Sequence, residues 1–525
     1  MPTQSMPRVS AQTLKRWLHD GDEIALFDVR EHGQYGEGHP FFAVPLPYSM
    51  LERDVGRLAP NRRARIVVYD DGDNPAAQAA NRLREIGYTN VHVLDGGTRA
   101  WNETGFVLFK GVNVPSKAFG ELVEEIAGTP HVSALTLAQW QRSAHPPVVL
   151  DGRPVSEFHA MNIPGASCCP NGELAYRIDA IVADQHTPIV INCAGRTRSI
   201  IGAQTLRHLG IGNPVYALAN GTQGWFLDDL SLEHGQHRPY PANVQPGDER
   251  VRAARALAER AGVEWVSAAT VRDWLDAGEH SVYLCDVRTP EEFAQGSLRG
   301  AQHAPGGQLQ QATDQYIGVR HARIVLFDDD GIRAAVTASW LRQLGHAAFV
   351  LDGGLESGLE LPADAPFATH LLPEIDAPTL ARRLANGDMS VIDLRASAAW
   401  IKGHIPGSIW SIRSRLAAVL QQCKPAITLV ADDARIAAWA IADLPNANRY
   451  DFAVLSGGLE AWRKAGESES TGAEAISPAQ RIDYLFFTHD RHAGNKAAAR
   501  EYLSWETALL AQLDDDEIKE FRPLK

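Results

Sequence analysis

One cysteine of this chain stands where a predicted strand gives way to a predicted helix. Cys193 follows the apolar run 189–191 and opens a short loop that carries two arginines and leads into a helical pattern. A thiolate at that point faces the unpaired amides and the positive dipole end of the helix, with guanidinium groups beside it. We therefore predict a nucleophilic thiol in an anion-binding loop. The other residues of this loop are Ala194, Gly195, Arg196, Thr197, Arg198 and Ser199.

The framework around this loop is repeated along the chain. A strand-end triplet, Asp-x-Arg in form, follows an apolar run and begins at Asp28, Asp151, Asp286 and Asp393. In three copies the next β-type run ends 42 positions later, at Asp70, Cys193 and Asp328. In the fourth copy the corresponding run reaches Ala431 after 38 positions. Equal spacing of this kind is the signature of internal repeats, and only one of the copies has the thiol.

A glycine turn closes each copy. Paired glycines follow an apolar run at 96–97, 353–354 and 457–458, and Asn220-Gly221 is the degenerate version in the second copy. Such glycines permit a tight turn with positive φ. Between the landmarks strands alternate with helices, which predicts an α/β fold in which each copy is a mainly parallel sheet flanked by helices. In such sheets function lies at the carboxyl ends of the strands.

These landmarks divide the chain into four tandem domains and a tail. The expected domains cover residues 5–109, 130–232, 262–358 and 374–467. Residues 110–130, 230–262 and 359–374 are expected to be linkers. The last segment, 477–525, is expected to be a helical extension, because residues 495–513 carry apolar positions at helical spacing.

Composition narrows the function classes. A net charge of −14 disfavours nucleic acid and anionic membranes as partners, since both need a basic face. The N-terminal residues lack the apolar core of a secretory signal, and no apolar run is long enough for a membrane helix, so we expect a cytoplasmic protein. The histidines and cysteines show no metal-ligand spacing, and we expect no metal and no cofactor.

The chain has four further cysteines, which we interpret as packing residues. Cys169 is the one alternative, because it would serve as a resolving thiol if the fold brought it near Cys193. These four are Cys168, Cys169, Cys285 and Cys423.

Taken as a set, four motifs resemble the rhodanese superfamily over roughly residues 5–467. They are the Asp-x-Arg triplet, the segment Gly-His-Ile-Pro-Gly at 403–407, the six-residue loop that begins at Cys193, and the glycine turn. The resemblance implies a bacterial-type thiosulfate sulfurtransferase with four domains, in which the loop cysteine carries sulfane sulfur as a persulfide. Because Asp70, Asp328 and Ala431 or Asp432 occupy the cysteine position elsewhere, the other three domains are expected to be inactive.

In this scheme thiosulfate, or a related small anionic donor, gives its outer sulfur to Cys193 while Arg196 and Arg198 hold the sulfonate oxygens. Cyanide, a thiol or a protein thiolate is the expected acceptor. The amides of the loop 194–199 would cradle the persulfide. Asp151 and Arg153 are expected to form a supporting pair at the strand end. Arg177 is expected either to add positive charge near the pocket or to lie on a solvated helix face.

Two other functions remain open at this stage. One is a persulfide sensor or sulfur-delivery scaffold that turns over little. The other is a phosphatase or arsenate reductase. The short loop disfavours this function, because the corresponding loop of such enzymes is one residue longer.

Overall fold

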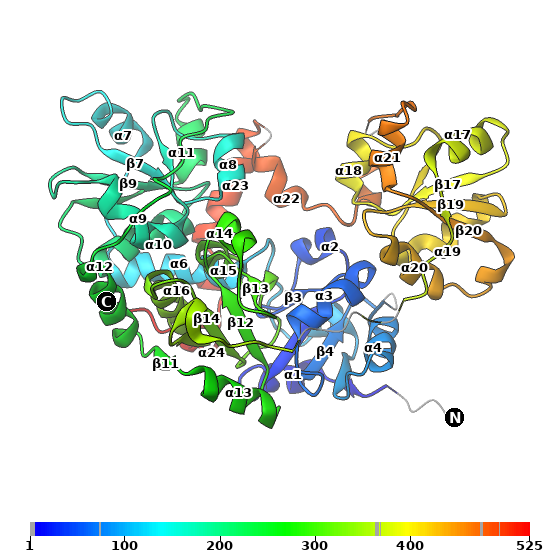
Figure 1. The fold of residues 1–525 in the computed structure, drawn as a ribbon, viewed down its shortest axis with the longest axis horizontal. Coiled ribbons are helices and arrows are strands. Elements are labelled where there is room, and N and C mark those ends of the chain that lie inside the picture. Colours follow the sequence, from blue (N-terminus) through cyan, green and yellow to red (C-terminus); the bar gives the residue numbers. More distant parts are fainter. Residues whose placement is uncertain (1–5, 73–74, 363–366, 368, 473–475, 493) are drawn as a thin grey trace.

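The computed structural model describes residues 6–72, 75–362, 367, 369–472, 476–492 and 494–525. Within them the chain forms four five-stranded parallel sheets with helices on their faces (Figure 1). All four sheets share one strand order: β1-β5-β4-β2-β3, β6-β10-β9-β7-β8, β11-β15-β14-β12-β13 and β16-β20-β19-β17-β18. The predicted α/β class and the fourfold repeat are therefore confirmed.

The first sheet shows how the repeat is built, with each strand followed by a helix or short turn. Its strands are β1 (Arg8–Val9), β2 (Ile24–Asp28), β3 (Val44–Pro45), β4 (Arg65–Tyr69) and β5 (Val91–Leu94). Its helices are α1 (Ala11–Trp17), α2 (His32–Glu37), α3 (Leu51–Leu58), α4 (Pro75–Glu85) and α5 (Gly97–Glu103). The central strands β2 and β4 are almost wholly buried, as expected for a sheet covered on both faces.

The second sheet carries the cysteine loop. Its strands are β6 (His131–Val132), β7 (Val148–Asp151), β8 (Ser167–Cys168), β9 (Ile189–Asn192) and β10 (Val215–Leu218). Its helices are α7 (Ala134–Trp140), α8 (Val155–Ala160), α9 (Asn171–Ile181), α10 (Thr197–His208) and α11 (Gly221–Leu227). Strand β9 lies between β7 and β10, so the residue that follows it stands at the middle of the carboxyl edge.

The third and fourth sheets repeat the pattern. The third has β11 (Glu264–Val266), β12 (Val282–Asp286), β13 (Gln302–His303), β14 (Arg323–Phe327) and β15 (Ala347–Leu351), with α13 (Ala268–Ala277), α14 (Pro290–Gln295), α15 (Gly306–Gln311) and α16 (Ile332–Gln343). The fourth has β16 (Glu374–Ile375), β17 (Ser390–Asp393), β18 (Ile409–Trp410), β19 (Ala426–Val430) and β20 (Asp451–Leu455), with α17 (Ala377–Ala385), α18 (Ser397–Lys402), α19 (Leu416–Val419), α20 (Ala434–Ala442) and α21 (Gly458–Lys464).

Two expected linkers contain helices instead. Helix α6 (Val114–Ala127) packs on α10, and α12 (Asp248–Arg260) packs on α16. Gly128, with φ of 57°, ends α6 in the left-handed region where glycine is favoured. One hydrophobic core runs through the first three domains and includes residues of α6 and α12, whereas the fourth domain has core clusters of its own.

The predicted helical tail is confirmed. It contains α22 (Phe486–His489), α23 (Lys496–Thr507) and α24 (Asp515–Lys519). Drawn in red in Figure 1, it leaves the fourth domain, crosses to the second, and contributes Leu509, Leu513 and Phe521 to the shared core. Among the described residues, no helix has the length and apolar character needed to cross a membrane.

Candidate active site

Cys193 is the first residue after the central strand β9, and α10 begins four residues later at Thr197. Its side chain is buried, and its Sγ lies 3.5 Å from the hydroxyl of Ser199. Within the described part of the chain, no carbonyl or side chain accepts a hydrogen bond from the backbone N–H of Arg196 or Arg198. The loop therefore presents free amide donors beside a thiol, as an anion cradle requires.

The glycine turn fixes the position of this loop. The N–H of Thr222 donates to the carbonyl of Cys193 at 2.8 Å, and the N–H of Gln223 donates to that of Ala194 at 3.1 Å. Gly221 has φ of 54°, and a Cβ placed on it would lie 2.3 Å from the Cys193 carbonyl oxygen. The turn requires glycine on both counts, because of its backbone conformation and because the loop approaches so closely.

A pocket of about 350 Å³ opens in front of the thiol. Besides the loop itself, its wall includes Lys117 of α6, Gln308 and Gln311 of the third domain, and Arg491 and Glu506 of the tail. The pocket in front of Cys193 is thus completed by segments far away in the sequence.

Arg196 lines the pocket but is held by carboxylates of α6. Its guanidinium donates two hydrogen bonds to Glu121, at 2.8 and 2.9 Å, and a third to Glu124. Burial lowers the pKa of Arg196 and these carboxylates raise it, with a net shift upward. Arg196 therefore ties the loop to α6.

Arg198 is paired in the same manner. Its guanidinium donates to both oxygens of Glu157 on α8, at 2.7 and 2.9 Å. Burial raises the pKa of Glu157, but Arg198, with smaller effects of Arg153 and Arg491, lowers it by more, and the net shift is downward. Both arginines expected to hold a substrate anion are therefore occupied by protein carboxylates.

The supporting residues lie in two different places. Arg153 donates to both oxygens of Asp151, at 2.8 and 2.7 Å, and to the carbonyl of Met161, so this pair closes the end of β7. Arg177 is buried between Glu173 and the carbonyls of Pro241 and Ala242. Arg177 is therefore not on a solvated helix face, and it does not line the pocket in front of Cys193.

Pocket residues that the sequence did not indicate come from α6 and from the tail. Lys117 is buried, and its ammonium donates to the carbonyl of Val112. Glu506 accepts a hydrogen bond from Thr197 at 2.9 Å, whereas its other oxygen, Oε2, has no hydrogen-bond partner among the described residues. A Cβ on Gly195 would lie 2.8 Å from that oxygen, which places it directly against the loop.

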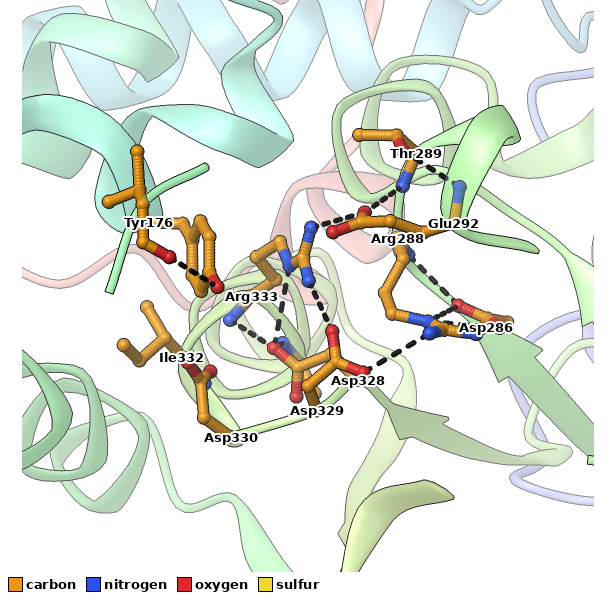
Figure 2. Close-up of polar contacts among 12 residues, drawn as sticks. Tyr176, Asp286, Arg288, Thr289, Glu292, Asp328, Asp329, Asp330, Ile332 and Arg333 are labelled. Carbon is orange, nitrogen blue, oxygen red and sulfur yellow. Dashed lines mark hydrogen bonds and ion pairs between the residues drawn. The ribbon is translucent and has the colours of Figure 1, made fainter. Parts of the chain in front are cut away.

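In the third domain, the loop is filled by its own side chain. Asp328 occupies the position of Cys193, and its carboxylate accepts N–H bonds from Gly331 at 2.7 Å and Arg333 at 2.8 Å (Figure 2). The guanidinium of Arg333 is buried and donates to Glu292 at 2.7 Å and to Asp329 at 2.9 Å. A built-in carboxylate thus takes up the amides that would otherwise bind an external anion.

The first and fourth domains also lack the thiol at this point. Asp70 follows β4 and accepts from the amides of Gly72 at 2.7 Å and Ala76 at 2.9 Å. Ala431 follows β19 directly. A carboxylate or a methyl group cannot carry a persulfide.

The remaining cysteines are unsuited to nucleophilic chemistry. Burial raises the pKa of Cys168 and of Cys285 to about 12, and burial also raises those of Cys169 and Cys423. Cys169 does not line the pocket in front of Cys193. The described residues contain no group of three or more His, Cys, Asp or Glu side chains arranged to hold a metal ion.

One of the four tandem parallel α/β domains carries a buried thiol at its strand-to-helix loop, an arrangement suited to a cysteine nucleophile. The family model "Rhodanese-like domain" matches residues 10–104, 133–228, 267–360 and 376–465. The chain belongs to this family and is an enzyme of the rhodanese-type sulfurtransferases.

Relatives are found along the whole chain and along parts of it. A crystal structure of a thiosulfate sulfurtransferase from Pseudomonas aeruginosa is 40% identical, covers 99% of this chain and 100% of its own, and superposes with a TM-score of 0.93. A putative thiosulfate sulfurtransferase, SseB, of Mycobacterium tuberculosis is 27% identical over 213 residues, which are 33% of this chain and 74% of the relative. An uncharacterized protein of Synechocystis is 28% identical over 138 residues, 26% of this chain and 75% of its own length.

Proposed function

We propose that the enzyme moves a sulfane sulfur from thiosulfate, or a related small anionic donor, through a persulfide of Cys193 to cyanide or a thiol. The observation that carries the proposal is the loop itself: one buried thiol, free amide donors around it, and a pocket in front of it. The full-length similarity to the Pseudomonas aeruginosa thiosulfate sulfurtransferase supports thiosulfate as the donor.

The first half-reaction loads the enzyme. The Cys193 thiolate attacks the outer sulfur of thiosulfate, a new S–S bond forms, and the original S–S bond breaks with its electron pair leaving on sulfite. The product is an anionic persulfide. The N–H groups of Arg196 and Arg198, which have no acceptor among the described residues, would stabilise that anion, as amides at helix N-termini do in general.

The second half-reaction unloads it. A nucleophile such as cyanide attacks the terminal sulfur, the Cys193 Sγ leaves as a thiolate, and thiocyanate is released. A thiol acceptor would give a small-molecule persulfide by the same exchange. No redox partner is needed, because the sulfur is transferred without net gain or loss of electrons by the enzyme.

The three domains whose loop carries no thiol are proposed to be inactive in sulfur transfer and to have architectural roles. Two contributions support this. The third domain provides Gln308 and Gln311 to the pocket wall, and its Arg333 is ion-paired with Glu173 of the second domain at 3.2 Å.

Intact mass spectrometry after exposure to thiosulfate tests the proposal. The unmodified enzyme is expected to gain one sulfur atom and to lose it when cyanide is added, with thiocyanate formed. Cys193→Ser is expected to gain none, whereas the matched control Cys169→Ser is expected to gain one. An equal gain in Cys193→Ser would disprove the assignment. Loading of Cys193 without turnover to cyanide would instead identify a persulfide sensor or a sulfur-delivery scaffold.

A further inference from the structure

We propose that Lys117 of α6 and Arg491 of the tail form the subsite that binds the anionic end of the sulfur donor in front of Cys193. The inference rests on the proposed sulfur-transfer function and names the residues that recognise the substrate. It replaces Arg196 and Arg198 as the donor-binding cations.

The loop arginines have their guanidinium groups committed to protein carboxylates. Arg196 is bound by two glutamates of α6, and Arg198 uses two of its nitrogens on Glu157. A substrate oxyanion would have to compete with these carboxylates at close range. Exchanging one anion for another at an already neutralised guanidinium yields little binding free energy.

Lys117 is a cation of the pocket wall without such a partner. Within the described residues, no carboxylate oxygen lies within ion-pair distance of its ammonium, which is bound instead to the Val112 carbonyl and lies 5.6 Å from the Trp505 ring centroid. A buried ammonium that lacks a counter-ion is costly on its own and gains strongly from an anionic ligand.

Arg491 is the second such cation. Its guanidinium lies 3.6 Å from the ring centroid of Tyr502 and donates to the imidazole of His492 at 3.1 Å, with no ion pair to a carboxylate among the described residues. The aromatic contact holds the planar group in place while leaving other N–H donors for a ligand. Arg491 thus has the fork of donors that a sulfonate or similar oxyanion requires.

The other charged groups of the pocket do not supply this positive charge. Burial lowers the pKa of His489, and burial together with Arg491 lowers that of His492 to about 3, so both are neutral at physiological pH. Glu506 faces Lys117 and the loop with its unpartnered oxygen, and it is the carboxylate that a donor anion would meet. Lys117 and Arg491 carry two positive charges against the single negative charge of Glu506.

The location of these two cations fits the chemistry. Lys117, Arg491 and Cys193 line the same pocket of about 350 Å³, which has room for a small dianion lying between the thiol and the cations. In Figure 1 the tail lies against the second domain, so that the polypeptide downstream of all four domains completes the substrate site of one of them. This gives the tail a function beyond packing.

Donor affinity can be measured for Lys117→Met and Arg491→Gln. Each variant is expected to raise the KM for thiosulfate about tenfold and to change the rate at saturating thiosulfate much less, since a charge-assisted contact is lost but the thiol loop is intact. The matched control is Arg500→Gln, which removes an equally charged but exposed side chain from α23 of the same tail. It is expected to leave KM unchanged.

A second measurement is independent of sulfur transfer. Sulfate, an inert dianion, is expected to protect Cys193 of the unmodified enzyme from alkylation by iodoacetamide, and to protect it about tenfold less well in either variant. If the unmodified enzyme gains no sulfur from thiosulfate but sulfate still protects, the proposed function fails and the anion subsite stands. If both variants match Arg500→Gln in KM and in sulfate protection, the subsite is disproved, whether or not sulfur is transferred.

Discussion

Arg198 and Glu157 form a two-point ion pair at the wall of the active-site pocket, with nitrogen–oxygen distances of 2.7 and 2.9 Å. The third domain repeats the pair as Arg333 and Glu292 at 2.7 Å, although its loop carries no thiol. Because the pair is present with and without the reactive group, its first role is to hold the start of α10 against α8 in the second domain, and that of α16 against α14 in the third. The candidate active site of the second domain is thus built on a scaffold that the third domain shares.

Replacing Glu157 by glutamine tests this separation of roles. In Glu157→Gln the positive charge of Arg198 is no longer neutralised by a carboxylate and can attract a donor anion, so this variant is expected to lower the KM for thiosulfate several-fold. It should also destabilise the protein by about 1 kcal/mol, the range found for partly exposed pairs. Glu292→Gln is the matched control: it removes the equivalent pair in the third domain and should leave KM unchanged. An equal change of KM in the two variants would contradict the interpretation.

The glycine turn provides a second prediction. Gly221→Ala puts a Cβ 2.3 Å from the Cys193 carbonyl oxygen, in a residue with φ of 54°, so the loop must move. Persulfide loading is expected to fall by more than about tenfold, as happens when a reacting group is misplaced by about 1 Å. Gly210→Ala has a similar backbone cost, with φ of 74°, but its Cβ meets no atom within 4 Å. Normal loading in Gly210→Ala, measured by intact mass, would assign the effect to the loop and not to backbone strain.

The position of the thiol could be predicted from the sequence, and the environment of the loop could not. Equal spacing of Asp28 to Asp70 and of Asp151 to Cys193 reflects equal sheet geometry, so the repeat places Cys193 at a strand end in one step. Ion pairing is different, because the partners of Arg196 lie 75 and 72 residues away, and Thr197 bonds to a glutamate 309 residues away. The sequence of the loop itself therefore cannot predict these contacts.

One of these misses had a local signal. Residues 110–130 were expected to be a linker, yet Pro115 stands in the first turn of α6 and Gly128 at its C-terminal cap, and both positions are typical of a helix with these bounds. Identifying the helix would have placed Lys117 and Glu121 on an ordered element, although not against the pocket. Only the packing of α6 on α10 brings Lys117 to the pocket, and the sequence of the helix does not reveal that packing.

The fourth domain is joined to the first by a buried ion pair, which leads to a third prediction. Glu52 of α3 accepts from Arg413 at 2.6 Å, and both side chains are essentially inaccessible. Glu52→Ala leaves the guanidinium with the partly exposed Asp443 as its remaining acidic partner, and is expected to lower the free energy of the first unfolding transition by about 3 kcal/mol. Glu460→Ala, which breaks the exposed pair with Lys464, should have no measurable effect in the same denaturant titration. Equal stability of the two variants would refute a role for the pair in docking the fourth domain.

The charge of Lys117 leads to a prediction about pH. The pKa of Lys117 is lowered to about 8, chiefly by burial, with Arg491 and Arg198 acting in the same direction and the carboxylates of Glu506 and Asp314 opposing the shift. Its ammonium is therefore present below about pH 8 and is lost as the pH rises through that value. Thiosulfate remains a dianion throughout this range, so its KM is expected to rise above pH 8 and to level off near the value of Lys117→Met, about tenfold higher.

The control for this prediction is Lys117→Met, in which the rise above pH 8 should disappear. The concentration of sulfate that gives half-protection of Cys193 should follow the same curve. Because that concentration compares alkylation with and without sulfate at each pH, it does not depend on how fast the thiol itself reacts. A KM that stays flat between about pH 7 and about pH 9 in the unmodified enzyme would show that the Lys117 ammonium does not bind the donor.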